Sequence, residues 1–251
     1  MQHSHLTAMF DVCVISLSRT PERLVQFRQR FLDYEALIRW LPAVDGQTLN
    51  LGLLCDEGLI DSSAMNWTVG QIGCALSHRT AWSQCLEADR PLLVFEDDAM
   101  AARCWYQKAH ELLVGFAQTE WDLVLLGWNF DSCLQLEWAP GHRFTALFRP
   151  RYPSLEELEI ALQQSSLPQC FRLNTALGLA GYLVSPGGAL KLLEWAFPLR
   201  TLPIVTPELP QRQCFSLDGQ LNALYSEINA YICFPPLAVG INDQGVSLTR
   251  V

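Results

Sequence analysis

The 251-residue sequence is poor in charged residues, and basic residues are the scarcer kind. Only 17% of the residues are charged while 50% are hydrophobic, a balance that excludes an intrinsically disordered chain. Lys and Arg number 17 against 26 Asp and Glu, which gives a formal net charge of -9. Because binding to nucleic acid needs clustered Lys and Arg, this deficit predicts no nucleic-acid partner. Local basic groups can still hold a small phosphorylated ligand.

The sequence also lacks paired cysteine motifs and long apolar runs. Its 9 cysteines are scattered and include no C-x-x-C pair, which favours reduced thiols over a disulfide framework or a structural zinc site. The segment from Met1 to Leu17 has no basic stretch and carries Asp11 among apolar residues, so it does not predict a secretory signal. Since no apolar run is long enough to span a bilayer, we expect a cytoplasmic protein whose membrane contact, if any, is peripheral and at the inner face.

Short apolar runs alternate along the chain with segments of helical periodicity. Strands are predicted at 12–17, 38–44, 92–95, 122–127 and 230–236, and helices at 21–31, 70–87, 106–116, 154–164, 189–197 and 220–227. Such alternation predicts an α/β fold with a mostly parallel central sheet flanked by helices. Ligands of such folds bind beyond the carboxyl ends of the strands.

Three consecutive carboxylates, Glu96, Asp97 and Asp98, follow the strand predicted at 92–95. Crowded carboxylates repel one another, which costs free energy unless a positive group lies beside them. Solvated or capping acids are the common explanation, but Mg²⁺ and Mn²⁺ prefer carboxylate oxygens, especially together with phosphate oxygens. Because side chains alternate along an extended segment, we expect Glu96 and Asp98 on one side and Asp97 on the other.

Several motifs accompany the triplet in a fixed order. They are VISLSRTPERLVQF at 14–27, PAVDG at 42–46, GQIGCALSH at 70–78, Trp82, LLVFEDDA at 92–99 and GYLVSPGGALKLL at 181–193. Together they resemble glycosyltransferase family 25, which includes bacterial lipooligosaccharide galactosyltransferases and relatives of the collagen galactosyltransferases. The resemblance covers most of the chain.

The resemblance implies a GT-A-type, Rossmann-like fold in a single domain over 1–251, with a lid or acceptor-side insertion around 138–170. It implies a hexosyltransferase of lipopolysaccharide biosynthesis that takes a hexose, galactose above all, from a UDP-sugar and inverts the reacting carbon. The acceptor would be a glycan or a lipid-linked saccharide. The cofactor would be Mn²⁺ or Mg²⁺, bridging the acidic motif and the diphosphate.

Matching the motifs residue by residue assigns the site. The implied metal ligands are Asp98 and Glu96. The implied donor contacts are Ser16, Arg19, Arg23, Asp45, Gly46, Ser77, His78 and Glu96. Asp218 and Asp98 are the implied catalytic residues, with Asp218 as the base on the acceptor side and Asp131 in reserve.

Structural roles also explain these residues when the resemblance is set aside. They are a solvated helix start for Arg19 and Arg23, a core position for His78, an ordinary turn for Asp45 and Gly46, and a helix cap for Asp218. Gln71 stands where family members commonly carry glutamate, and the tail at 239–243 only loosely resembles the family's ending. These two departures keep a second hypothesis open. The chain would then be a weakened, transferase-like protein that binds a nucleotide sugar or a partner. A phosphohydrolase is the weakest hypothesis, because no nucleophile pattern accompanies the triplet.

Overall fold

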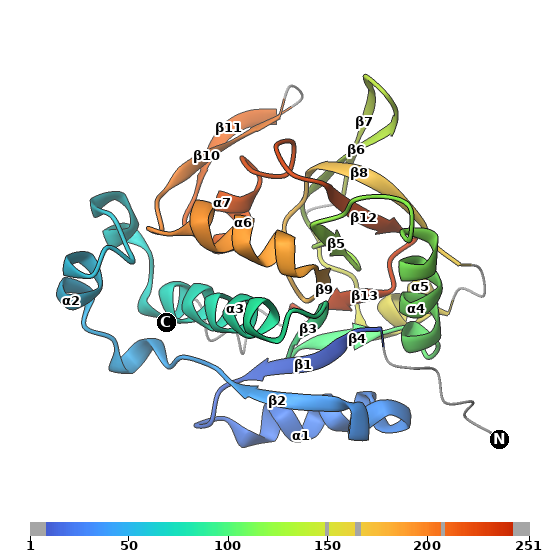
Figure 1. Cartoon of the computed structure of the whole chain (residues 1–251), viewed down its shortest axis with the longest axis horizontal. Helices are drawn as coiled ribbons and strands as arrows, with labels where there is room; N and C mark the ends of the chain where they lie inside the picture. Colours follow the sequence, from blue (N-terminus) through green and yellow to red (C-terminus); the bar gives the residue numbers. More distant parts are fainter. Residues whose placement is uncertain (1–8, 149–150, 164–166, 207–208, 243–251) are drawn as a thin grey trace.

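A computed structural model describes residues 9–148, 151–163, 167–206 and 209–242, and it shows a central sheet with helices on both faces (Figure 1). The strands lie in the order β2 (Ile38–Pro42), β1 (Asp11–Ser16), β3 (Leu92–Glu96), β9 (Gly181–Val184), β5 (Leu123–Leu125), β12 (Ala230–Phe234), β8 (Gln169–Thr175), β6 (Cys133–Ala139) and β7 (His142–Leu147). This arrangement confirms the predicted α/β class.

Strand directions make the sheet mixed. Pairing is parallel for β2–β1, β1–β3 and β5–β12 and antiparallel for the other neighbours. Within the described part of the chain, β2, β1, β3, β5, β12 and β6 therefore share one direction, while β9, β8 and β7 run against it. β9 was predicted only as part of a glycine-punctuated apolar segment, and it enters antiparallel between β3 and β5.

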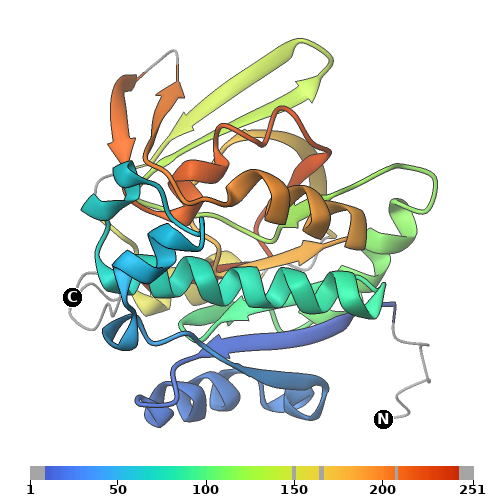
Figure 2. The ribbon, with the colours of Figure 1, turned by 60° about the vertical axis from the view of Figure 1, so that its left-hand side comes forward.

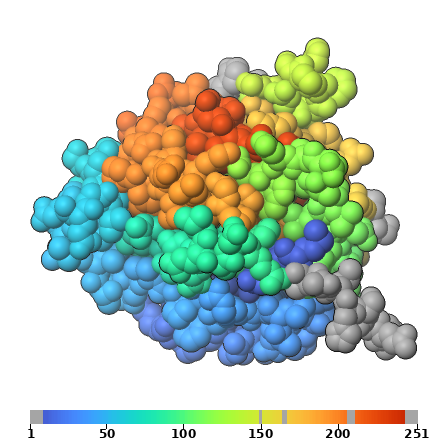
Figure 3. All heavy atoms as spheres, in the orientation of Figure 1, coloured from blue at the N-terminus to red at the C-terminus, as the bar shows by residue number. Residues whose placement is uncertain are grey.

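Each face of the sheet buries its own apolar core. On one face pack α3 (Val69–Ala88), α6 (Pro186–Ala196) and α7 (Leu217–Leu221), and on the other α1 (Pro21–Arg30), α4 (Trp105–Gly115) and α5 (Leu155–Leu162). β1 shows why: Cys13 and Ile15 join the α3 core, and Val12 and Val14 join the α1 core. Figures 2 and 3 show α3 and α6 side by side over their face.

The remaining elements are short. They are α2 (Leu51–Asp56), the pair β4 (Ala99–Ala101) and β13 (Ala238–Gly240), the hairpin β10 (Leu202–Thr206) and β11 (Leu209–Cys214), and 3-10 turns at Leu32–Leu37, Gly46–Thr48 and Ser62–Asn66. β4 follows the acidic triplet, and its pairing with β13 brings the late segment beside it: the Ile241 N–H donates to the Asp98 carbonyl at 3.0 Å. Among the described helices, none combines the length and apolarity needed to cross a bilayer.

Most predicted elements are present, with shifted ends. The helix predicted at 220–227 is the main difference, because α7 ends at Leu221. The reason lies in Asn222, whose side-chain amide exchanges hydrogen bonds with the backbone of Ala176 and so ties the chain to the neighbouring segment. Gln164, the predicted end of another helix, lies outside the described residues. The segment 138–170 contains β7, which lies at one end of the sheet, and α5, which packs in the core shared with α1 and α4; its role as a lid stays a prediction.

Candidate functional site

The carboxyl ends of β1, β2 and β3 meet at one edge of the sheet. Their parallel registers place Ile15 beside Glu96 and Ser16 beside Pro42. The loop after β1, the turn after β2 and the acidic triplet after β3 therefore lie side by side. These three segments carry most of the candidate residues, as expected for ligands bound beyond the strand ends.

Asp98 is the least compensated acid at this edge. Its Oδ1 atom is buried and has no hydrogen-bond partner among the described residues. Burial, followed by repulsion from Glu96, raises the pKa of Asp98 from 3.8 to about 7, although Arg23 and Arg30 act in the opposite direction. An added positive group beside this carboxylate would offset both the free-energy cost of its burial and its repulsion from Glu96.

Glu96 points to the α3 face. Its Oε1 receives a hydrogen bond from the Cys74 thiol at 3.8 Å and lies 3.1 Å from His78 Nε2. The other nitrogen of the His78 ring, Nδ1, lies 2.8 Å from the Tyr182 hydroxyl. Burial, and then the charge of Glu96, raises the pKa of Cys74 well above its ordinary value, so the group stays a thiol. The ligand atoms of Cys74, His78 and Glu96 also lie within 4.8 Å of one another, a spacing open to a metal ion.

Asp97 points to the opposite face, as the alternation predicts. Ser16 Oγ and Arg23 Nε each donate to its carboxylate at 2.8 Å, and Arg23 Nη2 also contacts it. Two helical turns further along α1, Arg30 donates to the Asp97 carbonyl at 2.6 Å and to the Ala99 carbonyl at 3.0 Å. Ser16 and Arg23 therefore hold the turn formed by Asp97 and Asp98, the acidic turn, in place. Their predicted contact with a donor stays a prediction.

The second loop is tied to the first loop and to α3. Arg19 Nε pairs with the Asp45 carboxylate at 2.9 Å, and Asp45 also caps the short turn that follows it. The buried Ser77 hydroxyl receives a hydrogen bond from Val44 N at 2.8 Å and donates to the Gly73 carbonyl at 2.7 Å. A Cβ at Gly46 would lie 2.1 Å from the Val69 carbonyl oxygen, so this close packing requires glycine.

Gln71 has a structural task at the start of α3. Its side-chain oxygen accepts from Thr68 N at 2.7 Å, and its backbone N–H donates to the Thr68 hydroxyl at 3.1 Å. This is a capping box, in which glutamate and glutamine are equivalent. The departure at Gln71 therefore leaves the helix start intact and weakens the argument that it lowers activity.

The two candidate bases differ in how their oxygens are used. Asp218 Oδ2 accepts from Gly178 N at 2.8 Å, and Oδ1 accepts from Gly219 N at 2.9 Å and from the Ser216 hydroxyl. The Asp131 carboxylate has neither a hydrogen bond nor an ion pair among the described residues. Burial, and then the charges of Asp98 and Asp131, raises the pKa of Tyr152, which places all three in one electrostatic neighbourhood.

Sequence reasoning missed several residues that the site uses. Asp97 was expected only to face away, and Tyr182 and Trp82 were interpreted as simple core. Two signals were present: Arg30 follows Arg23 by two helical turns, and Trp82 follows His78 by one, so each pair shares a helix face.

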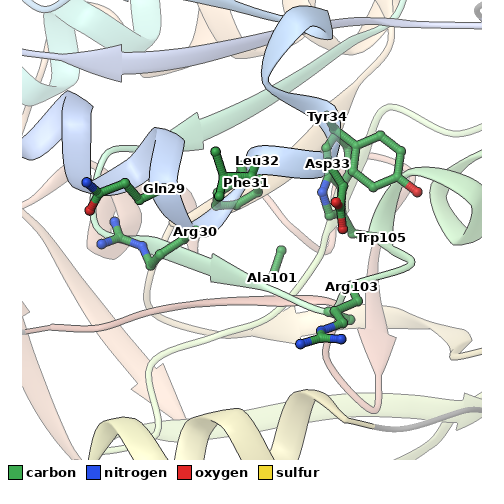
Figure 4. A pocket seen from close by; sticks show the side chains of 10 residues that line it. Gln29, Arg30, Phe31, Leu32, Asp33, Tyr34, Ala101, Arg103 and Trp105 are labelled. Atoms are coloured by element: carbon green, nitrogen blue, oxygen red, sulfur yellow. The ribbon is translucent and has the colours of Figure 1, made fainter.

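A separate cavity of about 330 Å³ lies between the end of α1 and the start of α4 (Figure 4). Arg30, Tyr34, Arg103 and Trp105 are among its lining residues, and no predicted site residue lines it. The predicted edge and this cavity are therefore distinct, although Arg30 borders both.

Comparison with known proteins gives one family. The model of glycosyltransferase family 25 (LPS biosynthesis protein) matches residues 9–204. Rat "probable inactive glycosyltransferase 25 family member 3" is 32% identical over 52% of this chain and 25% of that protein. Human procollagen galactosyltransferase 2 is 28% identical over 47% of this chain and 20% of its own length. Zebrafish (Danio rerio) procollagen galactosyltransferase 1 is 26% identical over 80% of this chain and 31% of its own length.

The chain thus spans about a quarter of the length of the first of these relatives. Among solved structures, mannose-1-phosphate geranyltransferase from Thermus thermophilus aligns over 90% of this chain and 74% of that chain. Its TM-score of 0.32 and identity of 12% are too low to support an argument.

Proposed function

This chain belongs to glycosyltransferase family 25, and from that premise we propose that it is a hexosyltransferase using a UDP-hexose donor. Galactose is the favoured sugar, because relatives are named procollagen galactosyltransferases. The observation that carries the proposal is the position of Glu96 and Asp98 at the carboxyl end of β3, with Asp98 Oδ1 buried and unpartnered among the described residues.

The residues at this edge fit a hard divalent cation. Asp98 supplies an oxygen without a partner among the described residues, and the contacts of the Glu96 carboxylate with Cys74 and His78 use Oε1 and leave Oε2 available. We propose that Asp98 and Glu96 hold Mn²⁺ or Mg²⁺, which would neutralise charge on the departing diphosphate. Arg19, which is about one-third exposed, is the basic group best placed to meet the donor from the first loop.

The proposed reaction is an inverting displacement. The bond between the anomeric carbon and the phosphate oxygen breaks with its electron pair leaving on UDP, while the acceptor oxygen bonds to the opposite face of that carbon. A carboxylate takes the proton of the acceptor hydroxyl. We now favour Asp131 over Asp218 for this role, because both oxygens of Asp218 already accept hydrogen bonds from the protein.

Asp131→Asn and Asp218→Asn separate the two candidate bases. We expect Asp131→Asn to lower kcat by about 10²–10⁴-fold, the usual contribution of a general base, with donor KM little changed. Asp218→Asn should instead lower the free energy of unfolding by about 1–3 kcal/mol, because asparagine keeps only one acceptor oxygen and the backbone N–H of Gly178 or of Gly219 then faces an NH₂ group. Steady-state kinetics and urea unfolding measure these effects. A large loss of kcat in Asp218→Asn, with little loss of kcat in Asp131→Asn, would instead assign the general base to Asp218.

The acceptor and location follow the same family. We propose a glycan or lipid-linked saccharide acceptor in lipopolysaccharide biosynthesis, reached from the cytoplasmic side by peripheral membrane contact. The segment 138–170 is the proposed acceptor-side element, since its Tyr152 hydroxyl donates to the carbonyl of Gly240 at 2.6 Å, and Gly240 is the residue of β13 that pairs with Ala99 of β4.

The second candidate function is nucleotide-sugar binding without transfer. It has specific support, because the rat relative is named a probable inactive member of the family and a human relative an inactive member. Purified protein with Mn²⁺ and a panel of nucleotide sugars, with and without glycan acceptors, decides between the two. Acceptor-stimulated UDP release and sugar transfer support the transferase, and binding without release supports the second function. Release of inorganic phosphate would indicate a hydrolase.

A further inference from the structure

A relay of hydrogen-bonded, buried side chains, formed by Trp82, Tyr182 and His78, leads from the core to Glu96. Trp82 Nε1 donates to the Tyr182 hydroxyl oxygen at 2.9 Å, the Tyr182 hydroxyl lies 2.8 Å from His78 Nδ1, and His78 Nε2 lies 3.1 Å from Glu96 Oε1. Trp82, Tyr182 and His78 are all at most 1% exposed. Their contacts join α3, β9 and β3, which contribute buried residues to the core.

The donors and acceptors available along the relay determine which atom donates in each of its hydrogen bonds. The Trp82 N–H can only donate, so the Tyr182 oxygen accepts it, and the Tyr182 proton is free to donate to His78 Nδ1. His78 Nε2 then carries the ring proton and donates to the Glu96 carboxylate. This tautomer is assigned from the network of partners. Any arrangement with a proton on Nδ1 leaves the Tyr182 hydroxyl proton without an acceptor among the described residues.

The same accounting opposes a metal ion held by Cys74, His78 and Glu96. Such an ion would need the lone pair of His78 Nε2, which would move the ring proton to Nδ1 and leave the buried Tyr182 proton unpaired. A buried donor without a partner costs about 1–3 kcal/mol. The close spacing of these three groups is therefore explained by hydrogen bonds to Glu96.

We propose that Trp82, Tyr182 and His78 are positioning residues that fix Glu96, so that Oε1 faces the protein and Oε2 faces the ligand edge. This inference rests on the proposed function for the identity of the ligand, a divalent cation with UDP. Partners of this kind, which orient a metal-binding carboxylate, typically change metal affinity by about 10–100-fold when removed. Because Trp82, Tyr182 and His78 are buried, the proposed role acts through Glu96.

The first test reads the relay itself and needs no ligand. Nitrogen-15 NMR of histidine-labelled protein reports which nitrogen of the His78 ring carries the proton. We expect the proton on Nε2, and we expect Tyr182→Phe to change the Nδ1 signal. A ring protonated on Nδ1 alone would overturn the relay, whether or not the protein binds a nucleotide sugar.

The second test measures the affinity for Mn²⁺, which the relay is proposed to raise by orienting Glu96. We expect Tyr182→Phe and His78→Leu to weaken Mn²⁺ binding about 10–100-fold in the presence of UDP, measured by electron paramagnetic resonance of free Mn²⁺. His78→Gln, whose amide can still donate to Glu96, should stay within about threefold of wild type. If His78→Gln binds Mn²⁺ as poorly as His78→Leu, or if folded Tyr182→Phe binds it normally, the positioning role is wrong.

Tyr225→Phe is the matched control. Tyr225 is as fully buried as Tyr182, but its hydroxyl has no hydrogen-bond partner among the described residues. Removing it should leave Mn²⁺ binding unchanged and should not lower stability, because an unpaired buried hydroxyl is removed. Wild-type protein that binds neither Mn²⁺ nor UDP would contradict the proposed function, and the NMR test would still decide the relay.

Discussion

Asp98→Asn is expected to reduce sugar transfer at least about 1000-fold while making the metal-free protein more stable at pH 8. The loss of activity follows because an amide replaces the charged ligand proposed to hold the cation. The gain in stability follows because the buried carboxylate has no hydrogen-bond partner at Oδ1 among the described residues. Few substitutions away from functional groups would produce both effects together.

The raised pKa of Asp98 explains why removing its charge should stabilise the metal-free protein at pH 8. The pKa of Asp98 is about 7 in the folded protein against an ordinary 3.8, so between these values the folded state keeps a proton that the unfolded state releases. This group therefore costs stability progressively as pH rises from about 4 to about 7, and the full cost persists above pH 7. The gap corresponds to at most about 4 kcal/mol, and partial solvent contact reduces the expected gain to about 2 kcal/mol.

Urea unfolding at pH 5 and pH 8, with transfer assays alongside, measures both effects. Asp56→Asn, which changes an exposed carboxylate on α2, is the control and should alter neither quantity. An Asp98→Asn variant that keeps a tenth of wild-type transfer, or that is less stable than wild type at pH 8, would contradict the assignment.

Arg23→Met is expected to lower the free energy of unfolding by about 2–4 kcal/mol. The change leaves the Asp97 carboxylate, 8% exposed, without its guanidinium partner. Ser16 remains as a donor but carries no charge. Adding Asp97→Asn should restore most of the stability, because no buried charge is then left unpaired.

The Arg23→Met/Asp97→Asn pair also tests what Arg23 does for the donor. We expect Arg23→Met alone to raise the donor KM and the double variant to lie within about threefold of wild type, because Arg23 acts through the acidic turn that it holds. A double variant that is stable but keeps a raised donor KM would show that Arg23 meets the donor directly, as its motif implies. Arg28→Met, on the exposed side of α1, is the matched control.

Local pattern was enough to predict much of the edge. The alternation along 92–98 predicted Glu96 and Asp97 on opposite sides of the strand. The apolar runs predicted the ends of β1 and β3 to within one residue. These predictions depend only on neighbouring residues. The insertion of β9 between β3 and β5 could not be predicted, because strand order depends on contacts between distant segments.

The contacts that define the site are equally distant in sequence. Arg23 and Asp97 are separated by 74 positions, and Trp82 and Tyr182 by 100. No spacing rule connects such pairs, so Arg23 was predicted to contact a donor and Tyr182 was interpreted as core. The turn at Asp45 and Gly46, by contrast, was available from the sequence as a structural alternative, and it is present. The alternative role of Asp218 as a helix cap is wrong, because Ser216 is the N-cap residue of α7 and Asp218 lies in its first turn.

Diffraction from crystals soaked with Mn²⁺ and UDP, recorded where manganese scatters anomalously, would locate the proposed metal site. We expect one anomalous peak bound by Asp98 and by Glu96 Oε2, with the UDP diphosphate beside it and the His78 contact to Oε1 unchanged. A peak ligated by Cys74 and His78, or UDP bound at another place with no peak at Asp98, would contradict the proposed metal site.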